Sequence, residues 1–278
     1  MKPEATPLPR EHGAWGLLLQ PFLAAAILAG RWSWALIPAF TLVFSGFLLR
    51  EPLVAALRIR KRSPAGGWMW PLRWFAAEAT VAAVSLVVLA YVVKVPLGAL
   101  AIVVAVGAAF TILAVWMAVQ NRQRSTLLQT AAVAGLSASA VVVALAVLHE
   151  VPAWTWWLWL LVTLHGVASV LSVHARLAAR IAAAKSTVSD GSMLGKAYLA
   201  TAVQALAAVP TVWITGHWLL AVPLLFSAAV HGWELWRLKD AEVLRERLQA
   251  VGFRMLGVSI AHTLLAIWAL WKLLPATP

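Results

Sequence analysis

Residues 97–119 read LGALAIVVAVGAAFTILAVWMAV, an unbroken apolar run without a charged side chain. An α-helix rises about 1.5 Å per residue, so a helix of this length would measure about 35 Å. The hydrocarbon core of a membrane is about 30 Å thick. The run therefore predicts a helix that crosses a membrane, and the class of the whole fold depends on how often such runs recur.

Apolar runs of this kind recur along the chain. Of its 278 residues, 63% are hydrophobic and 12% are charged, and a soluble domain of this composition would expose large apolar patches. The runs do not alternate between apolar and polar residues as the strands of a membrane barrel do. The sequence thus predicts an all-α, polytopic membrane helix bundle that forms a single domain over residues 1–278. We expect nine transmembrane helices, near residues 13–30, 34–49, 74–93, 97–119, 127–148, 154–173, 197–215, 218–236 and 252–271.

The basic residues are distributed unevenly between the two sides of this predicted bundle. If nine helices cross the membrane in alternating directions, 19 of the 22 lysine and arginine residues fall on one side, and only Arg31, Lys94 and Lys272 fall on the other. Loops rich in lysine and arginine stay in the cytoplasm. We therefore expect a protein of the bacterial cytoplasmic (inner) membrane, with its N-terminus inside and its C-terminus outside. Topology then explains the net charge of +12, and we expect no nucleic-acid partner.

Three cytoplasmic segments are expected to be longer than a tight turn. Residues 50–73 and 174–196 are expected to be loops that follow the second and sixth helices. In residues 237–251, Leu244, Leu248 and Val251 would share one helical face, with charged residues on the other. That pattern is typical of a short helix that lies on a membrane surface.

Polar side chains gather where the predicted helices reach the cytoplasmic side. Charged groups at the centre of a membrane cost roughly 2.5–3.5 kcal/mol each, so their positions are informative. Arginine and lysine reach the interface with their long side chains, whereas glutamate is too short to do so. A polar cavity that opens to the cytoplasm explains the positions of the glutamates better than simple anchoring of the helix ends does. Anchoring remains the alternative interpretation. The residues predicted to bind a ligand there are Glu11, His12, Arg50, Glu51, Glu78, His174, Arg176, Arg180, Lys185 and Glu234.

The N-terminal motif resembles that of a known family. Residues 10–21 read REHGAWGLLLQP. This string is similar to the opening of the YwiC-like family, uncharacterised bacterial membrane proteins that share an EHGAW-type motif before the first helix, and the resemblance runs along most of the chain. More distantly, the layout resembles the UbiA superfamily of intramembrane prenyltransferases, which have nine helices, an N-terminus inside and long cytoplasmic loops after helices 2 and 6.

The chain departs from the UbiA superfamily at the residues that bind magnesium. Those enzymes hold a prenyl diphosphate through Mg²⁺ ions bound by two aspartate-rich motifs. Here Leu49 and Leu53 stand at the aspartates of the first motif, and Ala175 and Ala179 at those of the second, while the arginine of each motif is kept. Mg²⁺ prefers oxygen ligands such as carboxylates, and the chain also has no cysteine for a thiolate site. We therefore expect no metal and no cofactor, and an anion that arginine binds directly.

Two histidines lie near the middle of predicted helices. His165 and His262 could in principle ligate a haem or contact a quinone oxygen, although a single membrane histidine usually bonds to a neighbouring helix. On the sixth predicted helix, His165 shares one face with Ser169, Ser172 and Arg176, at spacings of four, three and four residues. This polar stripe must face the bundle rather than lipid. It either lines a pocket or joins helices, and both interpretations stay open.

These patterns favour a binding protein over an enzyme. We expect the chain to bind a membrane lipid or an isoprenoid-like or quinone-like small molecule, with a polar or anionic head and without magnesium. A UbiA-type prenyltransferase is the main alternative, but it would need acidic pairs that the two motifs lack. A small-molecule or lipid transporter is a further alternative, since such proteins place polar groups and interrupted helices at the membrane midplane.

Overall fold

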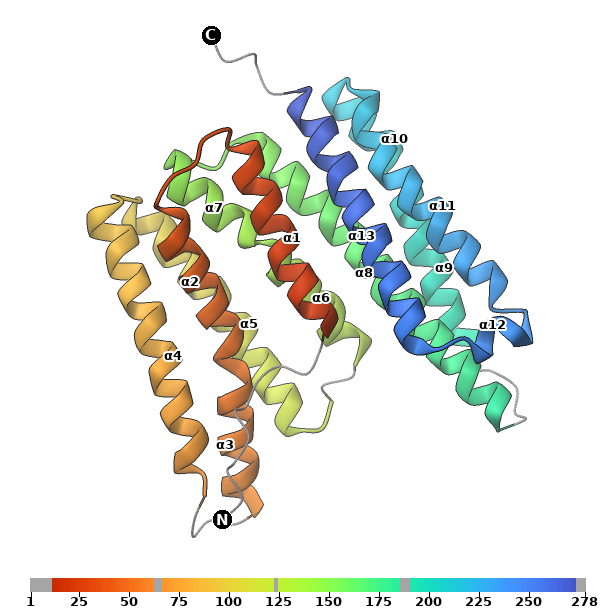
Figure 1. Ribbon diagram of the computed structural model, residues 1–278, viewed down its shortest axis with the longest axis horizontal. Coiled ribbons are helices and arrows are strands. Elements are labelled where there is room, and N and C mark those ends of the chain that lie inside the picture. The colour runs from red at the N-terminus through yellow and green to blue at the C-terminus, as the bar shows by residue number, and fades with distance from the viewer. Residues whose placement is uncertain (1–11, 63–66, 123–124, 186–190, 274–278) are drawn as a thin grey trace.

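Long α-helices make up the computed structural model of the protein (Figure 1). The structure describes residues 12–62, 67–122, 125–185 and 191–273. Helices suit a membrane because each satisfies its own backbone N–H and C=O groups where no water is present. The prediction of an all-α membrane bundle is confirmed, and no strand is present in the described ranges. The helical elements are α1 (His12–Leu28), α2 (Leu36–Leu48), α3 (Arg50–Arg62), α4 (Met69–Val87), the π-helical turn η1 (Val88–Val92), α5 (Leu97–Val119), α6 (Thr126–Ser137), α7 (Ser139–Leu148), α8 (Ala153–Ala184), α9 (Gly191–Leu206), α10 (Ala208–Thr215), the 3₁₀ turn η2 (Trp218–Leu220), α11 (Ala221–Arg237), α12 (Ala241–Arg245) and α13 (Leu248–Trp271).

The number of membrane-length helices differs from the predicted nine. In its described part the structure has eight such segments, and one more apolar helix, α1, has only 17 residues. At about 1.5 Å per residue it measures about 26 Å, which is less than the hydrocarbon thickness of about 30 Å. The prediction of nine full spans is therefore wrong for the part of the chain that the structure describes. The eight segments there that are long and apolar enough to cross a membrane are Leu36–Lys61, Met69–Val92, Leu97–Val119, Thr126–Leu148, Ala153–Ala184, Gly191–Thr215, Trp218–Arg237 and Leu248–Trp271.

The two long loops predicted after the second and sixth helices are mostly helical. The helix that begins with α2 continues through α3 to Arg62, so the loop prediction for residues 50–73 is wrong over most of its length. A turn at Leu49 separates α3 from α2, and Pro52 falls in the first turn of α3, where a proline is tolerated because the N–H groups of a first turn have no partner within their own helix. Similarly, α8 continues to Ala184 through a sequence rich in alanine and arginine, which are strong helix formers.

The segment 237–251 does not form one surface helix. α11 ends at Arg237, α12 occupies only residues 241–245, and α13 begins at Leu248. Between α12 and α13 the backbone of Glu246 leaves the helical conformation, with ψ near 140°. The chain then turns back into the bundle, and Val251 is buried within α13. The prediction of a single amphipathic surface helix is therefore wrong.

The helices run back and forth between two ends of the bundle. Figure 1 shows that α3, α5, α8 and α11 end, and α1 and α13 begin, at the same end of the molecule. We name this the basic end. Arg31, Lys94 and Lys272 follow α1, η1 and α13 directly and so lie at the opposite end. This arrangement agrees with the alternation that the charge pattern predicts, while the side that faces the cytoplasm stays a prediction.

The core is built around α1, which packs against α6, α7, α8 and α13. Its small residues Ala24 and Ala25 are at most 1% exposed. A close approach also occurs at Gly166 of α8, where an added Cβ atom would lie 2.6 Å from Val133 Cγ1 of α6 and 3.0 Å from Leu17 Cδ2 of α1. Small residues let helices pack closely in membranes. The rotation of α8 that results determines which of its side chains face α11 and α13.

Candidate functional site

Four charged side chains form a closed cluster at the basic end, where α8, α11, α12 and α13 meet. We name Arg176, Glu234, Glu246 and Arg254 the ion cluster. Arg176 lies 3.2 Å from a carboxylate oxygen of Glu234 and 2.6 Å from one of Glu246. Arg254 lies 2.8 Å from Glu234 and 2.5 Å from Glu246. Each carboxylate therefore contacts both guanidinium groups, and two positive charges balance two negative ones.

Half of the ion cluster is buried and half is partly exposed. The side chains of Arg176 and Glu234 are 6% exposed, whereas those of Arg254 and Glu246 are 30% and 27% exposed. Arg176 also donates to the backbone oxygen of Val243 at 2.5 Å, which ties α12 to α8. The hydrogen bond from Arg254 lowers the pKa of the Glu246 carboxyl to about 2. The cluster thus joins helices at the basic end rather than presenting free charge.

The structure brings three of the predicted ligand-binding residues to the ion cluster. Arg176 and Glu234 belong to it, and Arg180 donates from Nη1 to the backbone oxygen of Glu246 at 3.3 Å. The charges of Arg176 and Glu234 are already matched within the cluster. That these residues contact a ligand stays a prediction.

A second group of predicted residues lies on the other side of the basic end. Figure 1 shows α3 on one side of this end and α12 on the opposite side. On α3, Arg50 and Glu51 are neighbours, with Arg50 Nε 3.5 Å from Glu51 Oε1. Glu78 is a half-buried residue of α4, which packs against α3. The structure therefore does not bring Arg50 and Arg180 together in one basic cavity.

The remaining predicted residues lie apart from both groups. His174 of α8 is hydrogen-bonded through Nε2 to Gln129 Oε1 of α6. Lys185 is exposed at the end of α8. Glu11 lies outside the described residues, and His12 begins α1 with a side chain that is also outside them. Their predicted place at a cavity mouth stays a prediction.

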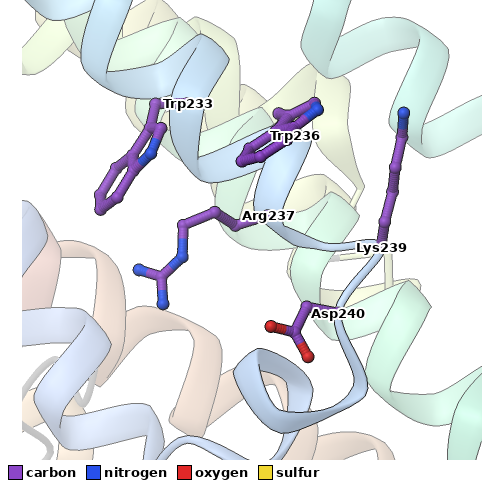
Figure 2. A pocket seen from close by; sticks show the side chains of 5 residues that line it. All are labelled: Trp233, Trp236, Arg237, Lys239 and Asp240. Carbon is purple, nitrogen blue, oxygen red and sulfur yellow. The ribbon is translucent and has the colours of Figure 1, made fainter.

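An open pocket lies where α11 ends. Figure 2 shows the five side chains that line it, and its volume is about 600 Å³. We name it the α11 pocket. Its lining residues are Trp233, Trp236, Arg237, Lys239 and Asp240.

The α11 pocket combines exposed aromatic rings with two cations. Trp233 and Trp236 are 50% and 60% exposed. The Arg237 guanidinium lies 4.7 Å from the centre of the Trp233 ring, within the range of a cation–π contact. Asp240 Oδ1 accepts a hydrogen bond from the backbone N–H of Glu242 at 2.9 Å and so caps α12. Within the described ranges, the charged groups of Arg237 and Lys239 form no ion pair.

Sequence reasoning missed the α11 pocket, although its signal was present. Residues 233–240 read WELWRLKD, in which two tryptophans three residues apart lead directly into two cations at the end of an apolar run. It also missed Glu246 as a partner of Arg176, and Arg254 as the second cation that contacts Glu234 and Glu246. Nothing in the local sequence distinguishes Glu246 from other charged residues of the same segment. Across the ranges that the structure describes, no group of three histidine, aspartate or glutamate side chains is placed to hold a metal ion.

Comparison with known proteins identifies the N-terminal half of the chain. The family model described as YwiC-like protein matches residues 8–145, which include the EHGAW motif and extend into α7. No curated protein and no solved structure matches the chain significantly. The matched region ends before the ion cluster and the α11 pocket, and the resemblance to the UbiA superfamily stays a prediction. Residues 8–145, just under half of the chain, are thus similar to the YwiC-like protein family.

Proposed function

We propose that the protein binds an anionic membrane lipid at the α11 pocket, with the headgroup held by Arg237 and Lys239 and without a magnesium ion. The observation that carries this proposal is the order of side chains along α11. Trp233 and Trp236 occupy the last turns of a membrane-length helix, and the two cations follow directly. Tryptophan prefers the membrane interface, and lipid phosphates lie just outside the hydrocarbon core. The two tryptophan rings would therefore contact the apolar part of a lipid, and the two cations would contact its charged headgroup.

The balance of charge favours the α11 pocket over the ion cluster as the anion site. In the ion cluster the positive and negative charges cancel. The α11 pocket is lined by two cations and one carboxylate, that of Asp240, so a net positive charge remains. A lysine or arginine near a membrane surface contributes about 1 kcal/mol to the attraction of anionic lipids. An anionic headgroup is therefore expected to bind at α11.

An isoprenyl diphosphate shares this chemistry, since it also joins an apolar tail to an anionic head. Diphosphate-dependent prenyl transfer would require carboxylates to hold magnesium. The carboxylate of Asp240 is hydrogen-bonded to the backbone, and no second acidic side chain lines the α11 pocket. The lining thus favours direct binding by cations over a metal-dependent transferase.

The proposal is tested by native mass spectrometry of the delipidated, full-length protein. Dioleoylphosphatidylglycerol is expected to bind more tightly than dioleoylphosphatidylcholine, which carries no net charge. Changing both Arg237→Ala and Lys239→Ala should remove about 2 kcal/mol, or roughly 30-fold in affinity. The matched control changes Arg245→Ala and Arg247→Ala, which removes the same charge from exposed side chains outside the pocket.

Each outcome of this experiment is informative. An equal loss in the two double variants would contradict the proposal, since it would mean that any positive charge at the basic end suffices. Loss of binding after chelation of divalent ions with EDTA would contradict direct binding by cations. Farnesyl diphosphate provides a second probe. If it displaces phosphatidylglycerol, and does so only with Arg237 and Lys239 present, the site accepts isoprenoid as well as lipid phosphates.

A further inference from the structure

Three histidines from three helices meet in the buried middle of the bundle. His165 of α8, His231 of α11 and His262 of α13 are at most 2% exposed, and we name them the histidine row. The ring centre of His165 lies 4.4 Å from that of His262 and 5.2 Å from that of His231, in stacked orientations. Ionisable side chains within a membrane are costly and are therefore usually functional.

The two outer members of the histidine row are bonded differently. His262 Nδ1 lies 2.9 Å from the Pro223 carbonyl oxygen and 3.1 Å from Ser227 Oγ, and its Nε2 lies 3.1 Å from the Leu161 carbonyl oxygen. Both nitrogens of His262 thus have partners on neighbouring helices, as expected for a residue that joins helices. His231 Nδ1, by contrast, is buried without a hydrogen-bond partner. Joining helices accounts for His262 but leaves one nitrogen of His231 unexplained.

His231 and His165 face each other through ring nitrogens. His231 Nε2 lies 3.4 Å from His165 Nδ1, and His165 Nε2 lies 2.7 Å from Ser259 Oγ. A neutral imidazole carries hydrogen on one nitrogen and a lone pair on the other. A hydrogen between the two rings can therefore belong to either. If a proton binds to His231 Nδ1, the hydrogen on His231 Nε2 can move to the lone pair of His165 Nδ1.

Polar groups lead from His231 toward the basic end. Glu234 follows His231 by about one turn of α11 and belongs to the ion cluster, which reaches the partly exposed Arg254. A small cavity of about 10 Å³ is lined by Ser172, Arg176 and Glu234 together with apolar side chains. This volume is close to that needed for one water molecule. The cavity lies on the basic-end side of the histidine row, about one turn from His231 along α11 at Glu234 and about two turns from His165 along α8 at Ser172.

Few other titratable groups accompany this path. The described parts of α6 and α7 contain none, and in α9 Lys196 and Tyr198 are exposed. Gln204 of α9 is the buried polar residue nearest to Ser227, to which it donates a hydrogen bond, and it carries no charge. On the helices of the row, toward the basic end, the titratable and charged groups are His174, Arg176 and Arg180 of α8, Glu234 and Arg237 of α11, and Arg254 of α13, and Glu246 lies between α12 and α13.

We propose that the histidine row is a proton-binding site of the membrane interior, loaded from the basic end and shared between His231 and His165. A hydronium ion at the cavity beside Glu234 gives a proton to His231 Nδ1 and leaves as water, and the hydrogen on His231 Nε2 passes to His165 Nδ1. One O–H bond and one N–H bond break, two N–H bonds form, and one positive charge then resides on the pair. His262 stacks on His165 and holds its ring in place. This site is independent of lipid binding at the α11 pocket.

The test is ¹⁵N nuclear magnetic resonance of the full chain with ¹⁵N-labelled histidine in phosphatidylglycerol nanodiscs. The pH is lowered from about 8 to about 3, because burial disfavours the charged form of a histidine ring and extends the window below that of exposed histidine. The signals of His165 and His231 should change together and account for one proton. His231→Gln should abolish the change at His165. The control, His174→Gln, changes another histidine of α8. His174 is hydrogen-bonded to Gln129, so this change should leave His165 and His231 unaffected.

A second variant tests the path without altering a histidine. Ser172→Val adds apolar volume to the small cavity and should slow the exchange of the ring N–H hydrogens of His231 and His165 with D₂O. Unchanged exchange in Ser172→Val would refute loading through this cavity. Rings of the parent protein that stay neutral throughout, or a change at His165 that persists in His231→Gln, would refute the shared proton and leave the histidine row as a contact between helices.

Discussion

Removing one arginine from the ion cluster is expected to destabilise the protein more than removing an arginine and a glutamate together. In Arg176→Met, Glu234 and Glu246 keep Arg254 as their shared cation, so the cluster changes from neutral to one net negative charge. Loss of one partner from a buried ion pair typically costs about 3–5 kcal/mol. Because Glu234 retains Arg254 at 2.8 Å, we expect the lower end of this range, about 3 kcal/mol.

The double change Arg176→Met with Glu234→Leu should restore most of this loss. It leaves Arg254 paired with Glu246 at 2.5 Å, so the remaining cluster is neutral. Replacing a buried pair by apolar side chains of similar size is often neutral. The hydrogen bond from Arg176 to the Val243 oxygen is also lost, and such a bond contributes about 1 kcal/mol. We therefore expect the double variant to lose no more than about 1 kcal/mol.

Equilibrium unfolding of the full chain in mixed micelles, with increasing dodecyl sulfate and tryptophan fluorescence as the signal, measures these free energies. Arg245→Met is the control, because this exposed arginine of α12 has no partner in the cluster and should change stability by less than about 0.5 kcal/mol. If the stability lost in the double variant equals the sum of the losses in Arg176→Met alone and Glu234→Leu alone, the two residues are not coupled and the reasoning fails. It also fails if Arg176→Met is as stable as the parent.

Three further predictions concern pH, packing and topology. The pKa of Glu246 is lowered from 4.5 to about 2, so its charge stabilises the fold above pH 4.5 and this stabilisation is lost as pH falls toward 2; Glu246→Gln should remove that part of the acid dependence in unfolding experiments. Gly166→Ala should cost about 1–3 kcal/mol because the stiff Val133 stands in the way, whereas Gly257→Ala, with nothing within 4 Å, should cost nothing measurable by the same assay. A reporter active only in the cytoplasm should work when fused to the N-terminus or inserted at residues 63–66 and fail at the C-terminus; activity at the C-terminus would contradict the expected orientation.

The amino-acid sequence was sufficient to predict the class of the fold and the alternation of its helices between two ends of the bundle. The run at 97–119 forms α5 with the same bounds. This success has a simple cause, because a membrane helix satisfies its own backbone hydrogen bonds and needs no partner to define it. Helix ends were less predictable. Residues 50–62 and 174–184 are charged enough to suggest loops, yet their alanine, leucine and arginine also favour helix, and the structure shows helix.

Only the tertiary structure decided which polar groups meet. From the sequence Arg176 is a cation available to a ligand, but Glu246, 70 residues further along the chain, lies 2.6 Å from it. His165 and His262 could each be placed near the middle of a predicted helix, whereas the stacking of His165 with His262 and with His231 could not be predicted. The physical reason is that apolar composition determines that a helix enters the membrane, while close packing at sites such as Gly166 determines how far each helix is rotated about its axis. That rotation decides whether a charged side chain faces a partner, a pocket or lipid.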